Sequence, residues 1–311
     1  LTILNKIENS GPDLLYYFQN ILQGVVTGNN DTYCITKIKE KNNKIVAFSK
    51  KLNSEIEFEK ENIRSVLGGS DIKRYKPVLE NKNNLIYPYY FKNGIQEAWT
   101  VDMLQKEYPL LFKYLNNFKK DLIHLKTKYK INSINWHHLH RPRKLSWFNQ
   151  EKIITPQISL GCNMTLDKIG LLHMDQVYSF IKKPTTDIPN EYFLGILNSK
   201  LLWFFIKSTS PVLRGGYYSF KSKYLELFHI PKYMNNESQN KIIKNVKQII
   251  EFENTNHNQY EITEKELLQK EKLENEINEI VYSLYKLDEV EKKIVEHNYP
   301  SQTKKNFTNQ T

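Results

Sequence analysis

The stretch EYFLGILNSKLLWFFIKSTSPVLRGGYYSFKSKYLELFHIPK, residues 191–232, joins an apolar segment to a glycine-rich and basic loop. The apolar part, residues 192–206, predicts a buried helix. The loop and the segment after it hold the side chains that we expect to contact a polyanion: Arg214, Tyr217, Tyr218, Lys221 and Lys223. A buried helix that delivers such a loop to the surface predicts a binding role for this part of the chain.

The positive charge of the chain is unevenly distributed. The sequence of 311 residues has a net charge of +11, yet residues 233–311 hold 11 Lys and Arg against 14 Asp and Glu. Residues 1–232 therefore hold 34 basic and 20 acidic side chains, a balance of +14 against −3 in the remainder. A cationic surface on the larger part is what nucleic-acid binding requires.

Composition argues against several other classes. Apolar residues make up 40% of the sequence, enough for a core. No uninterrupted apolar run reaches the roughly 18 residues of a membrane span, and no signal peptide begins the chain. Two cysteines are too few for a disulfide framework, so we expect a reducing, cytoplasmic setting. Because the first residue is Leu1, we also expect a fragment of a longer polypeptide.

The N-terminal part predicts strands joined by a polar loop. Residues 21–26 and 33–36 have strand character, so residues 27–31 would form the tip of a hairpin. Small hydrogen-bonding side chains are the kind that read base edges in a DNA groove. The tip therefore supplies the candidate contacts Thr27, Asn29 and Asn30, with an ordinary surface turn as the alternative.

A second glycine-containing segment, residues 63–75, places three cations beside a pair of glycines. Glycine permits a close approach of the backbone to a ligand. Arg64, Lys73 and Arg74 are therefore candidate phosphate contacts.

Residues 134–147 form the most polar and aromatic stretch. Three histidines within four positions raise a metal site as one interpretation, but no cysteine or paired acidic ligand accompanies them at zinc-like spacing. A basic, aromatic edge on a nucleic-acid surface is the interpretation that we favour, with Trp136, Arg141 and Arg143 as contacts. No metal is expected.

Helical periods dominate two regions. Residues 101–129 repeat apolar side chains every three or four positions, which predicts one long amphipathic helix. Apolar positions from Leu273 to Leu287 step by four and three, a heptad spacing. We expect two C-terminal helices packed as an antiparallel hairpin, the second of which faces another domain or subunit.

The predicted organisation has three parts. Residues 1–232 form an α+β domain, a mixed and β-rich DNA target-recognition domain with packed helices. Residues 233–298 form a helical hairpin or coiled-coil-like tail, and residues 299–311 are expected to be disordered.

The sequence contains no clear catalytic motif. It has no Pro-Pro pair and no G-x-G, so the cofactor loop and the [DNS]-P-P-[FYW] motif of an amino-group methyltransferase are absent. Asp13 with residues 71–73 (DIK) matches the acidic pattern of a Mg-dependent nuclease, yet such tripeptides arise by chance in a chain rich in Lys and Glu. A binding domain whose chemistry lies elsewhere is the simpler interpretation.

Four segments in order resemble one known family. Residues 22–30 (LQGVVTGNN) are similar to its GI-TG-N opening, and residues 67–75 (LGGSDIKRY) to its segment ending in DI-(K/R)-R-Y. Residues 194–201 (LGILNSKL) match its ILNSKL helix, and residues 277–296 resemble its helical tail, although Lys286 replaces a usual glycine. The chain thus resembles the TaqI-like C-terminal specificity domain, the target-recognition part of adenine-specific DNA methyltransferases and type IIG restriction-modification enzymes.

This resemblance implies recognition rather than catalysis. The larger part would lie against double-stranded DNA, and a separate or upstream methyltransferase, reached through the helical tail, would methylate a flipped adenine. S-adenosylmethionine is expected in that partner, and no cofactor in this chain. Specificity residues vary within the family, so the bases that are read do not carry over.

Three alternatives remain open. A type I-like specificity subunit would also use a helical tail, although it usually has two recognition domains and two helical spacers, where this sequence has one of each. A stand-alone Mg-dependent nuclease and a protein-interaction scaffold belong to other classes, and the uneven charge disfavours the scaffold.

Overall fold

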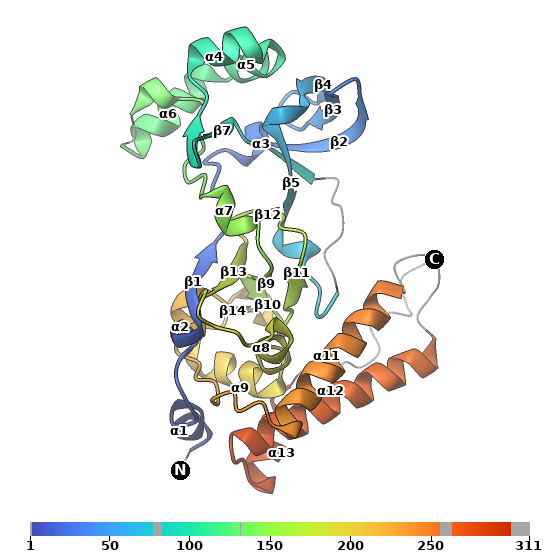
Figure 1. Cartoon of the computed structure of the whole chain (residues 1–311). Helices are drawn as coiled ribbons and strands as arrows, with labels where there is room; N and C mark the ends of the chain where they lie inside the picture. Colours follow the sequence, from blue (N-terminus) through green and yellow to red (C-terminus); the bar gives the residue numbers. More distant parts are fainter. Residues whose placement is uncertain (1, 77–82, 131, 256–262, 300–311) are drawn as a thin grey trace.

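The chain folds into two stacked parts, each around its own hydrophobic core (Figure 1). The computed structural model describes residues 2–76, 83–130, 132–255 and 263–299. We call residues 24–148 the head, and residues 3–23 together with 149–299 the base. Both parts mix helices with sheets, which confirms the predicted α+β class.

The head is built on a six-stranded sheet with the order β12-β5-β6-β2-β3-β4. Its strands are β2 (Cys34–Lys41), β3 (Lys44–Ser49), β4 (Ser54–Glu59), β5 (Ile63–Leu67), β6 (Asn83–Ile86) and β12 (Leu172–His173). Side chains alternate between the two faces of a strand, so Ile35, Ala47 and Phe58 lie buried on the core face. Helix α5 (Pro109–Asn116) packs on this face, where the hydroxyls of Tyr114 and Ser49 are hydrogen bonded at 2.8 Å.

The predicted single helix at residues 101–129 is wrong, because the region forms three helices. They are α4 (Val101–Glu107), α5 and α6 (Lys119–Lys128). Tyr108 leaves helical geometry at φ −134° and ψ 60°, and Pro109, which cannot donate a helical hydrogen bond, begins the next helix. The apolar residues nevertheless face the core as their spacing predicts, with Leu104, Leu111 and Leu122 buried.

The predicted hairpin with its tip at residues 27–31 is also wrong. Strand β1 (Phe18–Gln23) pairs with β13 (Val177–Lys182) in the base, whereas β2 pairs with β3 and β6 in the head. The polar loop is therefore the passage from base to head, and it leads into the short helix α3 (Asn30–Tyr33).

The base contains a four-stranded sheet with the order β1-β13-β9-β11 and a two-stranded sheet of β10 and β14. Its other strands are β9 (Lys152–Pro156), β10 (Ile158–Ser159), β11 (Thr165–Asp167) and β14 (Tyr218–Ser219). In the head, β7 (Tyr89–Lys92) and β8 (Ile95–Ala98) form a separate hairpin. The short helices of the base are α1 (Ile3–Glu8), α2 (Leu14–Tyr17) and α10 (Ser222–Leu225), and the short helix α7 (Leu145–Phe148) ends the head. Among the described residues, no helix has the length and apolar character needed to cross a membrane.

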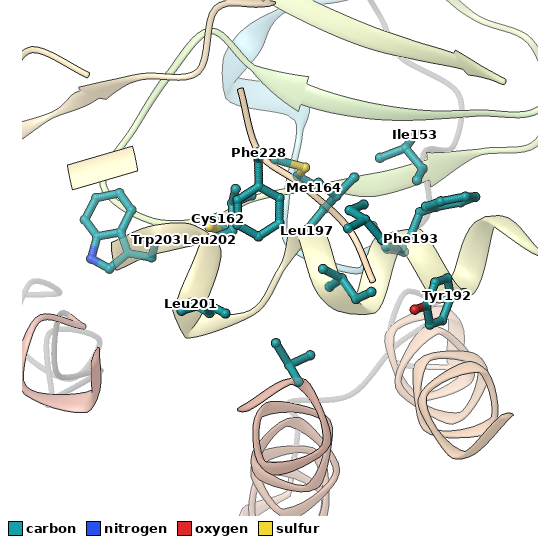
Figure 2. Packing of buried hydrophobic residues seen from close by; sticks show 14 of the residues in the cluster. Ile153, Cys162, Met164, Tyr192, Phe193, Leu197, Leu201, Leu202, Trp203 and Phe228 are labelled. Atoms are coloured by element: carbon teal, nitrogen blue, oxygen red, sulfur yellow. The ribbon is translucent and has the colours of Figure 1, made fainter. Parts of the chain in front are cut away.

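The apolar stretch at residues 192–206 forms two helices rather than one, α8 (Asn190–Leu197) and α9 (Lys200–Thr209). Ser199 has extended backbone angles, and its hydroxyl accepts a hydrogen bond from the N–H of Leu202, which begins the second helix. Both helices lie in the core of the base, where Phe193, Leu197 and Leu202 contribute buried side chains (Figure 2).

Three helices form the tail: α11 (Glu237–Thr255), α12 (Glu264–Leu284) and α13 (Glu289–His297). Helices α11 and α12 lie side by side against α8 (Figure 1). A Cβ on Gly195 of α8 would lie 2.4 Å from Ile242 and 3.2 Å from Val246, so only glycine permits this close packing.

The prediction gave two partners for the heptad side of α12, another domain or another subunit, and the structure shows this side packed against helices of residues 1–232 of the same chain. Leu273 and Ile277 are buried in the core of the base, because α12 turns this side toward α8 and α9 of its own chain, and Leu287, which follows the helix, is buried there as well. The predicted disorder at residues 299–311 falls almost wholly outside the described residues; Tyr299, the one residue within them, is partly buried against the base.

The head and the base exchange residues where they meet. Tyr75 of the head belongs to the core of the base, and Leu172 and Met174 of the base belong to the core of the head. At the passage between them, a Cβ on Gly24 would lie 2.2 Å from the carbonyl oxygen of His173, so this position requires glycine.

Candidate nucleic-acid interface

The cationic excess lies in the head. Residues 24–148 hold 23 Lys and Arg against 12 Asp and Glu, so the head alone carries a net charge of +11. Several of these cations lie close to carboxylates, as Lys37 does to Glu40 at 2.7 Å. Lys73 and Arg141 are exposed and have no ion pair with any described residue, which leaves them available to an anion.

The loop that carries Thr27, Asn29 and Asn30 is held by its own polar side chains. The Thr27 hydroxyl donates to the Asn30 side-chain oxygen at 2.5 Å, and the Asn29 side-chain oxygen caps α3 by accepting from the N–H of Thr32 at 3.2 Å. Thr27 is buried, Asn29 is half-buried and Asn30 is exposed. Asn30 is therefore the member of this group that the fold presents to a partner.

Arg74 lies inside the protein. Its guanidinium donates to both carboxylate oxygens of Glu274 in α12, to Oε1 at 3.3 Å and to Oε2 at 2.9 Å, and to the carbonyl oxygens of Cys162 and Asn198 at 3.1 and 2.5 Å. Burial opposes its charge, but attraction to the Glu274 carboxylate, together with Tyr299, Tyr75 and the hydrogen bonds to Glu274, outweighs burial and raises the pKa of Arg74 above its ordinary value. Arg74 thus joins the DIKRY and NSK segments, two of the four motifs quoted above, to helix α12, at a position three residues before the fourth motif begins.

The other two cations of this segment differ in exposure. Arg64 lies half-buried on β5, opposite Leu85 of β6. Lys73 is exposed, next to the turn in which the Asp71 carboxylate accepts from the N–H of Gly68 at 2.7 Å.

Trp136 is a core residue rather than an exposed edge. Only 3% of its surface is exposed, and the Lys119 ammonium lies 5.6 Å from its ring centroid. The neighbouring His137 is hydrogen bonded to the carbonyl oxygen of Trp99 at 2.6 Å, and burial lowers its pKa. Among the described residues, no group of three or more His, Cys, Asp and Glu side chains is arranged to hold a metal ion.

Arg141 and Arg143 lie at the passage between head and base. Arg141 forms a backbone bridge with Val26 and points its side chain to solvent. The Arg143 guanidinium donates to the carbonyl oxygen of Gly24 at 3.2 Å, and burial followed by repulsion from Arg141 lowers its pKa. Arg141 is therefore the accessible cation of the pair.

The loop at residues 211–217 is exposed, and β14, which follows it, anchors it to β10 of the base. Arg214 and Tyr217 are exposed, while Tyr218 packs edge-on against Trp203 at 5.3 Å between ring centroids. Lys221 precedes α10 and is half-buried, and the Lys223 ammonium lies 4.7 Å from the Tyr224 ring centroid. Glycines at φ +81° and +78° form the turn after Arg214, in a conformation that glycine adopts without strain.

Backbone hydrogen bonds join this loop to the head through two glutamines. The N–H of Phe220 donates to the carbonyl oxygen of Gln157 at 2.8 Å, and the N–H of Gln157 donates to that of Gln176 at 2.7 Å. The side-chain oxygen of Gln176 lies 3.5 Å from the backbone nitrogen of Gly69, which belongs to the same segment as Lys73. The structure thus connects the two basic glycine-containing segments through one turn.

The sequence contains no motif that marks the turn at Gln176 or the polar residues near it. A groove of about 200 Å³ lies beside the turn, lined by Asn30, Lys50, Asn83 and Gln176 among others. Of these, only Asn30 stood among the predicted contacts. Isolated amides in strands and turns carry no motif, so their convergence appears only after folding.

The family model of the TaqI-like C-terminal specificity domain matches residues 64–231, which is more than half of the chain. The chain belongs to this family, and the suspected resemblance is confirmed.

A solved structure has the same fold. The type IIL restriction-modification enzyme MmeI in complex with DNA matches 90% of this chain at 10% sequence identity, with a TM-score of 0.58. The match covers 35% of the MmeI chain, so this chain spans about a third of that protein. At this identity the likeness concerns the fold alone. No curated protein sequence matches the chain.

Proposed function

We propose that this chain is the part of a restriction-modification enzyme that recognises a specific sequence in double-stranded DNA. Its membership of a family of specificity domains carries the proposal. The net charge of +11 on the head and the exposed Arg214, Lys73 and Arg141 support it, since cations supply most of the affinity for the phosphate backbone. MmeI, which has this fold, is bound to DNA in its solved structure.

The chemistry belongs, in this proposal, to a partner. An adenine-specific methyltransferase domain, as in type IIG enzymes, would bind S-adenosylmethionine in the cytoplasm and act on the DNA that this chain positions. If that partner docks on the helical tail, the outer side of the tail must serve, because the heptad side of α12 is already buried. Leu268 of α12 and Val290 of α13 are 60% and 68% exposed there.

Binding of fluorescent duplexes by the whole chain tests the proposal. Selection from a randomised duplex pool should yield a consensus sequence, and its affinity should fall steeply with salt. The plot of log affinity against log salt concentration has a negative slope, and each lost phosphate contact should make it less steep by about 0.9. We expect this change for Arg214→Ala and Lys223→Ala, but not for Lys247→Ala on α11. Affinity that does not depend on salt would refute the proposal.

A further inference from the structure

The polar groove beside the turn at Gln176 lies where the open face of the head sheet meets the base. Thr36 of β2 and Asn83 of β6 are paired neighbours on this face, and both line the groove. Asn30 of α3, Lys50, Gly68 and Gln176 also line it, next to apolar side chains such as those of Val66 and Met174. We call Thr36, Asn83, Asn30, Lys50, Gly68 and Gln176 the reading groove.

The chemistry of the reading groove differs from that of the cationic surface around it. Three carboxamides and a hydroxyl supply both donors and acceptors. The single cation, Lys50, has the carboxylate of Asp31 in the same lining, so the groove is close to neutral although the head carries +11. Phosphates would favour the surrounding cations, whereas mixed donors and acceptors match the edges of bases.

The size of the groove also favours an edge over an enclosed ligand. Its volume of about 200 Å³ is smaller than the roughly 300–1,000 Å³ of pockets that enclose small molecules. Two of its lining residues are held in place, since the Thr27 hydroxyl and the cap of α3 fix Asn30, and the N–H of Gln157 fixes the backbone of Gln176. Such preorganised side chains lose little entropy when they bind.

We propose that the reading groove contacts base edges in the major groove of DNA, and that Asn30, Lys50, Asn83 and Gln176 determine which sequence is bound. This inference rests on the proposed function. Carboxamides pair with the N6 and N7 atoms of adenine, and lysine pairs with the O6 and N7 atoms of guanine. The groove therefore favours a target with both A·T and G·C pairs at the positions it covers.

The test uses the whole chain and the consensus duplex selected by the wild-type protein. Asn30→Ala and Gln176→Ala should each weaken binding to that duplex by about 5- to 150-fold, the range that one bidentate base contact gives. Binding to a scrambled duplex should change less than about twofold, and reselection should give a consensus degenerate at one or two positions. Gln105→Ala, an exposed glutamine on α4, is the matched control and should leave both affinities unchanged.

The outcomes separate this inference from the proposed function. If the wild-type protein selects a consensus and both groove variants retain it with full affinity, the inference is wrong and the proposed function stands. Equal losses on both duplexes would assign the groove to phosphate binding and overturn the inference as well. No consensus from the wild-type protein would refute the proposed function together with the inference. Thermal unfolding of each variant identifies any loss caused by misfolding, and Gln176→Glu then tests the same position without removing its bulk.

Discussion

Replacing Arg74 with alanine should detach the helical tail from the rest of the base rather than remove a DNA contact. The side chains of Arg74 and Glu274 are 10% and 14% exposed, and the guanidinium donates to both carboxylate oxygens, so that they form a two-point ion pair. The same guanidinium donates to the carbonyl oxygens of Cys162 and Asn198. Alanine would leave a carboxylate and two carbonyl groups without their donor.

The magnitude follows from the burial of the pair. Removing one partner of a buried ion pair costs about 3–5 kcal/mol, because the remaining charge is left without compensation. A domain is stable by only about 5–15 kcal/mol, so this one change removes a large share of the free energy of unfolding. Glu274→Gln should cost less, because the amide oxygen still accepts one hydrogen bond.

Urea unfolding followed by circular dichroism and tryptophan fluorescence measures this loss. Trp203 reports on the tail, since its ring N–H donates to the carbonyl oxygen of Asn298 at 3.0 Å. The double variant Arg74→Met with Glu274→Leu should recover part of the stability, because it removes both charges. A loss below about 1 kcal/mol, together with a lower salt slope of DNA binding, would contradict the internal role and restore Arg74 as a phosphate contact.

Three further predictions concern the base. Gly195→Val should lower the free energy of unfolding in urea by more than about 3 kcal/mol, because even a Cβ at this position would lie 2.4 Å from Ile242. A loss below about 1 kcal/mol would show instead that α11 moves to make room. Lys152→Met should cost about 3–5 kcal/mol, because it leaves its fully buried partner Asp167 unpaired. Adding Asp167→Leu should not rescue it, since that carboxylate also accepts three backbone N–H groups, so full recovery in the double variant would refute this account. Burial, followed by repulsion from Lys152, lowers the pKa of His173 to about 3, so the unfolded chain binds the proton more readily than the folded protein. The free energy of unfolding should therefore fall as pH drops from about 6.5 toward 3, by up to about 1.4 kcal/mol per pH unit. If the free energies of unfolding of the wild type and of His173→Gln changed in parallel with pH, this account would be wrong.

Local patterns predicted the composition of the cores but not the breaks between elements. The apolar period at residues 101–129 identified the buried face of each helix, since Leu104, Leu111 and Leu122 all face the core of the head. It missed that Pro109 begins a new helix, because periodicity continues across a short break. The polar loop at residues 27–31 suggested a hairpin because strand pairing over a long separation leaves no local mark.

The candidate interface was predictable to a similar degree. Exposed basic loops such as the one at Arg214 follow from sequence, because charge beside glycine favours a solvent-facing turn. Arg74 appeared equivalent to Lys73 in the sequence, and only the position of Glu274, which lies 200 residues further along the chain, distinguishes them. The amides of the reading groove come from separate strands and turns, so no spacing in the sequence brings them together.

The exchange of residues between head and base bears on how such a protein can be recombined. Tyr75 of the head packs in the core of the base, and Leu172 of the base pairs with Val66 in the six-stranded sheet of the head. A chimera that replaced residues 24–148 as a cassette would therefore lose Tyr75 and Arg74 from beneath the tail and leave Leu172 without its strand partner. We therefore expect a change of specificity to succeed by substituting single residues in the intact protein rather than by exchanging the whole head.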